Sequence, residues 1–124
     1  MVVRIAINVL RVSVLLALIL GILFWTGNAT SLTLLHIGLG ILAVLALWTL
    51  GAAIAGTKGG IGLAIVAFIW GILVAAFGLN QATLLVGSTH WVIQVLHLLV
   101  GLAAIGLGEM IAGRYKRVMA AATT

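Results

Sequence analysis

The sequence of 124 residues contains no cysteine, no proline and no aspartate, and its single acidic residue is Glu109. The absence of cysteine excludes disulfides, thiolate metal sites and cysteine nucleophiles. Without aspartate, and with one glutamate, the chain has neither a Ser-His-Asp triad nor a pair of catalytic carboxylates. The sequence also lacks the glycine-rich motif of a phosphate-binding P-loop. Lys58 and the two glycines after it instead have the sequence of a turn.

Apolar residues are abundant instead. They make up 65% of the chain, and the mean hydropathy is +1.46. A soluble domain of this size leaves much of its surface exposed and cannot bury so many apolar side chains. The net charge of +5 does not indicate nucleic-acid binding, because the basic residues cluster outside the apolar runs. The composition therefore predicts an integral membrane protein surrounded by the lipid bilayer.

Four apolar segments are long enough to cross a bilayer as helices, since a crossing needs about 20 residues. They run approximately over residues 5–25, 32–55, 61–79 and 91–112. We expect an all-α fold, a single transmembrane domain over residues 1–124 arranged as an up-down-up-down four-helix bundle.

The basic residues predict the orientation of this bundle. They flank the first segment, the connection between the second and third, and the end of the fourth: Arg4, Arg11, Lys58, Arg114, Lys116 and Arg117. The other two connections carry no lysine or arginine. The positive-inside rule then places both termini in the cytoplasm, and we expect a multi-pass protein of the bacterial plasma (inner) membrane. Trp25 and Trp91 suit the outer aromatic belt.

The two halves of the chain resemble each other weakly. The tripeptide Gly-Ile-Leu begins at Gly21 and again at Gly71, and the dipeptide Leu-His ends at His36 and again at His97. Such self-similarity predicts two pseudo-symmetric helical hairpins. The repeat also favours a retained first helix over a cleaved signal peptide.

His36 and His97 are the strongest candidates for a functional site. A histidine inside the hydrocarbon layer is costly, so its partner must be sought. In the predicted bundle the second and fourth helices are parallel and diagonal, on the order of 14 Å apart. Gly40 and Gly101 lie one turn beyond each histidine, where a missing side chain lets a flat ring approach the backbone. This pattern predicts a haem b held between the two histidines, which would be its metal ligands.

Two other interpretations of these residues stay open. Sixteen glycines are expected for close helix packing alone, and intramembrane histidines also form interhelical hydrogen bonds. A zinc or copper site is disfavoured, because His90 lies two turns from His97 on the same helix and is too far away to share one small ion.

Three further polar residues have a predicted role. His90 and Gln94 share a stripe with His97, so both are candidates for contacts with the cofactor, although His90 also suits a helix-entry position after Ser88 and Thr89. Glu109 is expected to pair with Arg11 on the neighbouring antiparallel helix. The alternative for Glu109 is proton or cation coupling in a small exporter.

The whole helical plan resembles the small four-helix membrane b-type cytochromes and the haem-bearing anchor subunits of respiratory complexes, on the residues His36 with Gly40 and His97 with Gly101. The stretch from Trp91 to Glu109 is also similar to an uncharacterised group of small bacterial membrane proteins. Two-haem members of the cytochrome group use four histidines, so the resemblance implies one haem here. Small multidrug exporters carry their glutamate in the first helix, where this chain has none.

Together these features predict a membrane electron carrier or subunit rather than a stand-alone enzyme. Its partners would be a redox protein or a quinone, within a homo-oligomer or a larger complex, and not nucleic acid. The first alternative is a non-enzymatic accessory or assembly subunit of a larger membrane complex, or a subunit that binds a chlorophyll-type pigment. The second is a small proton-coupled transporter that uses Glu109.

Overall fold

A computed structural model describes residues 1–123 of the chain. Its four α-helices are α1 (Val2–Trp25), α2 (Thr33–Ala55), α3 (Ile61–Asn80) and α4 (His90–Ala121). Single 3-10 turns precede α2 (η1, Thr30–Leu32) and follow α3 (η2, Gln81–Thr83). All four helices are long and apolar enough to cross a membrane, and the predicted all-α fold with four helices is confirmed.

The helix ends follow the predicted ones closely except at α4. This helix continues to Ala121, nine residues beyond the predicted end at Ala112. The prediction ended it where the apolar run ends, but Arg, Lys, Ala and Met are good helix formers in any solvent. The first helix ends as expected near Trp25, where Gly27 takes a left-handed φ of +78° that glycine adopts without steric cost.

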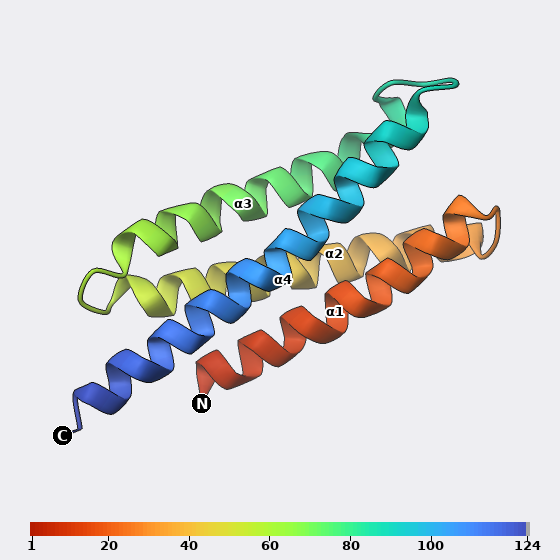
Figure 1. Cartoon of the computed structure of the whole chain (residues 1–124). Coiled ribbons are helices and arrows are strands. Elements are labelled where there is room, and N and C mark those ends of the chain that lie inside the picture. Colours follow the sequence, from red (N-terminus) through yellow and green to blue (C-terminus); the bar gives the residue numbers. More distant parts are fainter. Residues whose placement is uncertain (124) are drawn as a thin grey trace.

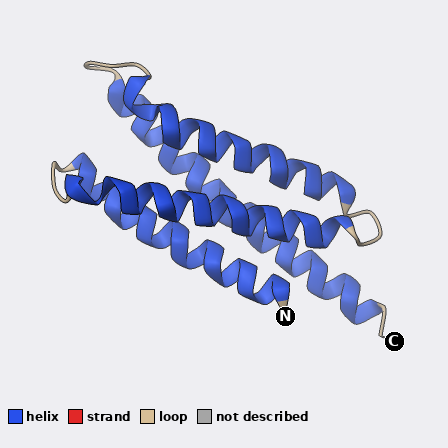
Figure 2. Ribbon diagram, turned by 180° about the vertical axis from the view of Figure 1, so that it is seen from behind, coloured by secondary structure: helices blue, strands red, loops and turns tan. Residues whose placement is uncertain are grey.

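The helices form two hairpins, α1 with α2 and α3 with α4, whose connections lie apart at one end of the molecule (Figure 1). The N-terminus, the C-terminus and the turn between α2 and α3 lie toward the opposite end. The reverse view shows the same separation of the two hairpin connections (Figure 2). We call the end at which the two hairpin connections lie apart the open end of the bundle. The end that carries both termini and the α2–α3 turn is the closed end.

The closed end contains the tightly packed core. Its largest fully buried side chains come from α1, α2 and α4: Leu10, Leu47, Leu50, Ile54 and Ile111. Small residues let the helices approach there. A Cβ on Gly51 would lie 3.1 Å from the Cβ of Ala67 in α3, and a Cβ on Gly108 would collide with Leu10. Such close van der Waals packing, rather than a hydrophobic driving force, holds helices together within lipid.

Polar contacts also join the helices at the closed end. The predicted pair between α1 and α4 is confirmed: Arg11 donates from Nε to Glu109 Oε1 at 2.5 Å and from a terminal nitrogen to Oε2 at 2.8 Å. In addition, Arg114 donates to the carbonyl of Gly59 in the α2–α3 turn at 2.8 Å. These bonds join α4 to α1 and to the α2–α3 turn at the closed end of the bundle.

The relation between α2 and α4 corrects the predicted square arrangement. Among the described residues, α2 and α4 contact each other, whereas α1 and α3 do not. The bundle is therefore compressed along the α2–α4 diagonal, and the separation of about 14 Å estimated for an ideal square does not apply. Crossing helices with small residues at their interface produce this departure from a square.

A candidate cofactor cavity with two facing histidines

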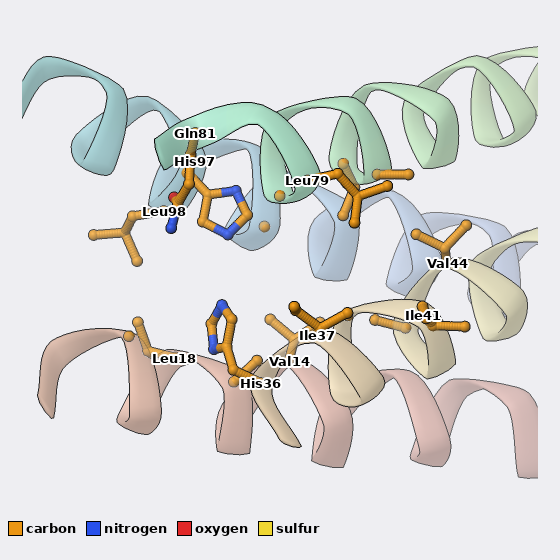
Figure 3. A pocket seen from close by; sticks show the side chains of 18 of the residues that line it. Val14, Leu18, His36, Ile37, Ile41, Val44, Leu79, Gln81, His97 and Leu98 are labelled. Atoms are coloured by element: carbon orange, nitrogen blue, oxygen red, sulfur yellow. The ribbon is translucent and has the colours of Figure 1, made fainter. Parts of the chain in front are cut away.

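A cavity of about 390 Å³ lies between the two hairpins at the open end. Its volume falls within the range of about 300–1,000 Å³ that is typical of small-molecule and cofactor sites. All four helices line it, mainly with aliphatic side chains (Figure 3). No lysine, arginine, aspartate or glutamate lies among its lining residues. The cavity thus suits a largely apolar ligand.

His36 enters this cavity from the first turn of α2. It is half-buried, and the ring of Phe24 from α1 meets it edge-on at a centroid distance of 5.3 Å and an interplanar angle of 67°. Edge-to-face contacts of this kind are favourable between aromatic rings. Phe24 therefore restrains the orientation of the imidazole from the side of its own hairpin.

His97 enters from α4, on the other hairpin. The two imidazole rings face each other across the gap (Figure 3), with centroids 6.0 Å apart and planes inclined by 56°. The nitrogen that points across the gap is in each case the one at the far end of the ring from Cβ, which is Nε2 (Figure 3). The fold thus brings together two residues that are 61 positions apart in the sequence.

The separation of the rings discriminates between a direct contact and a shared ligand. A direct N–H···N hydrogen bond, about 3 Å long, places imidazole centres roughly 5 Å apart. A metal ion about 2 Å from each nitrogen places them roughly 6 Å apart. No hydrogen bond joins the two rings in the described part of the chain. The two rings are therefore not joined directly, and their centroid distance of 6.0 Å is closer to the second value than to the first.

The remaining ring nitrogens are enclosed. The Nδ1 atoms of both histidines are buried and have no hydrogen-bond partner in the described structure. Metal-bound histidines usually donate from the nitrogen that does not bind the metal to a backbone carbonyl or carboxylate. Neither histidine makes such a bond in the described structure.

The predicted glycines, Gly40 and Gly101, both line the cavity. A Cβ built on either would meet nothing within 4 Å, so the space left by the missing side chains is part of the cavity. Both glycines thus leave open space on the sides of α2 and α4 that face the cavity.

Two glycines that the sequence prediction did not place at the site lie closest to the histidines. A Cβ on Gly21 of α1 would lie 3.7 Å from His36 Cε1, and one on Gly78 of α3 would lie 3.4 Å from His97 Cε1. In each hairpin, a glycine of the first helix thus lies next to the histidine of the second helix. The counterpart of Gly21 is Gly78 and not Gly71, which packs against the indole of Trp48. The match of the two Gly-Ile-Leu tripeptides was therefore the wrong alignment of the two halves.

Gln94 lines the cavity as predicted, and so does Gln81 from η2, which the sequence prediction missed. Gln81 follows the last residue of α3, so only the packing of α3 against α4 reveals its position. Trp48 borders the inner part of the cavity and donates from Nε1 to the carbonyl of Phe68 at 3.2 Å. This bond fixes the indole between α2 and α3.

His90 is not part of the cavity. Its Nδ1 lies 3.1 Å from the carbonyl of Leu84 in the connection before α4, and it is the first residue of the helix. The helix-entry interpretation therefore describes its position better than cofactor contact does. Thr89 precedes it as the N-cap but makes no side-chain capping bond, contrary to expectation. Glu109 also lies away from the cavity, at the closed end.

Comparisons with protein-family models, with curated proteins and with solved structures found no match for this chain.

Proposed function

We propose that this chain is a membrane b-type cytochrome that binds one haem between α2 and α4 and takes part in electron transfer. The observation that carries the proposal is the facing pair His36 and His97, whose centroids lie 6.0 Å apart across an apolar cavity. Bound there, a haem would supply a reversible one-electron couple.

Each part of the cavity has a role in this proposal. His36 and His97 would hold the haem through their ring nitrogens, and Phe24 restrains the ring of His36. Gly40 and Gly101 would leave room for the macrocycle. Because two protein nitrogens would bind the iron, little room would remain for a substrate on the metal. The proposal therefore favours electron transfer over substrate chemistry, with a quinol or a redox protein as the exchange partner.

The proposed orientation in the membrane has the closed end in the cytoplasm. The termini and the α2–α3 turn lie toward this end (Figure 1). Five of the six basic residues lie in or near these segments, and the sixth, Arg11, lies in the half of α1 nearer the N-terminus. By the positive-inside rule the basic end faces the cytoplasm. The four helices then cross in alternating directions as two related hairpins, and the cavity lies near the outer face of a bacterial plasma membrane.

A chlorophyll-type pigment is the second candidate. A cavity without lysine or arginine also accepts a tetrapyrrole whose carboxylates are esterified. Such a pigment needs one axial histidine, however, which leaves the second facing ring without a role. The transporter hypothesis has no comparable support, since Glu109 is bound by Arg11 through both oxygens.

A titration of detergent-purified apoprotein with haemin tests the proposal. We expect saturation at one haem per chain and the absorption spectrum of a six-coordinate low-spin haem. Saturation with a five-coordinate spectrum, or no saturable binding, would contradict coordination by both histidines.

A further inference from the structure

The cavity has polar groups that coordination by the histidines does not use. Besides the imidazoles and the indoles of Trp25 and Trp48, its polar side chains are the amides of Gln81 and Gln94. Both glutamines are half-buried, and within residues 1–123 neither side chain has a hydrogen-bond partner. Two free amides thus face an otherwise aliphatic space.

These amides lie toward the open end of the cavity. Gln94 precedes His97 by one turn of α4, and Gln81 lies beyond the end of α3 at η2. In Figure 3, Gln81 and His97 lie toward one side of the view, and Val44 and Ile41 lie toward the other. The two amides of the lining are therefore on the side of η2, and its inner part is largely aliphatic.

This asymmetry matches a ligand that is apolar over most of its area and polar along one edge. A haem b has this form, because its two propionates leave from one edge of the macrocycle. Each glutamine amide offers two N–H donors, and a carboxylate accepts hydrogen bonds only. With no lysine or arginine in the lining, the two amides offer most of the side-chain donors available to those carboxylates, beside the single N–H of the Trp25 indole.

We propose that Gln81 and Gln94 bind the propionates of the haem and thereby fix its orientation, with the carboxylate edge toward η2. This inference rests on the proposed haem site and names the two residues that would select a tetrapyrrole diacid over its ester. The side chains act by hydrogen bonding from half-buried positions, where bonds to a charged acceptor are stronger than neutral ones.

The test compares two probes, haemin and haemin dimethyl ester, in titrations of the apoprotein followed by absorbance. The wild type should bind haemin more tightly than the ester. In the double variant Gln81→Leu/Gln94→Leu, haemin binding should weaken by roughly tenfold or more, since a hydrogen bond to a charged group contributes about 1.5–3 kcal/mol. Binding of the ester should stay unchanged.

Two further variants keep the test decisive. Gln81→Glu and Gln94→Glu preserve side-chain size, and each should weaken haemin binding by charge repulsion while sparing the ester. Asn28→Leu is the matched control, because Asn28 bonds to Thr26 in the other hairpin connection and should alter neither affinity. Equal affinity of the wild type for both probes, or equal losses for both in the glutamine variants, would overturn the inference. Failure of both probes to bind through the histidines would instead refute the haem site itself.

Discussion

Arg11 in α1 binds both carboxylate oxygens of Glu109 in α4, although the two side chains are 51% and 43% exposed. Each residue lies within a helix long enough to cross a membrane. Removing one partner leaves the charge of the other without an opposite charge, and this destabilises the folded protein. Replacing both partners by apolar residues leaves no such charge.

Glu109→Leu should therefore lower the thermal unfolding midpoint in detergent, and Arg11→Leu/Glu109→Leu should recover most of the loss. Cofactor content per folded chain should be unchanged in both variants, because the pair lies outside the cavity. Additive losses in the double variant would show that the two residues do not act as a pair.

Gly101→Leu should separate cofactor binding from stability. A side chain at this position meets no atom within 4 Å of its Cβ and extends into the cavity. The apoprotein should be as stable as the wild type or gain about 0.5–1 kcal/mol, because glycine is a poor helix former, whereas haem binding should be lost. Gly106→Leu is the control, since Gly106 has equally open surroundings but does not line the cavity. Retention of haem by Gly101→Leu would contradict the proposed position of the ring.

Gly71→Ala tests the packing at the inner end of the cavity. The added Cβ would overlap the indole of Trp48, which is held by its bond to Phe68. Overpacking of this kind costs about 1–3 kcal/mol, so the unfolding midpoint should fall. Gly62→Ala, whose Cβ meets nothing within 4 Å, should leave it unchanged or raise it slightly, because alanine is the better helix former. Equal midpoints for the two variants would mean that Trp48 moves without cost.

The sequence was sufficient to predict the helices and one long-range contact. Four apolar runs of the length of a membrane crossing left few alternatives, and the single acid had one suitably placed basic partner, Arg11. The sequence also paired His36 with His97, and their rings lie 6.0 Å apart in the structure.

Rotation of the helices about their axes could not be predicted in the same way. Membrane helices such as α2 and α3 are apolar on every side, so no polar face indicates which residues point inward. Gly21, Gly78 and Gln81 were missed for this reason, since their roles depend on which helix packs against which histidine. His90 was assigned by helical spacing alone, and its contact with Leu84 depends on the conformation of the preceding connection.

The most direct measurement is the absorption spectrum of the purified protein, oxidised and reduced, expressed with ample haem. The account predicts a sharp reduced b-type band in the wild type and in His90→Ala, and its loss in His36→Ala and His97→Ala, with all four chains folded. A colourless wild type, or equal haem retention in the three variants, would contradict coordination of a haem by His36 and His97.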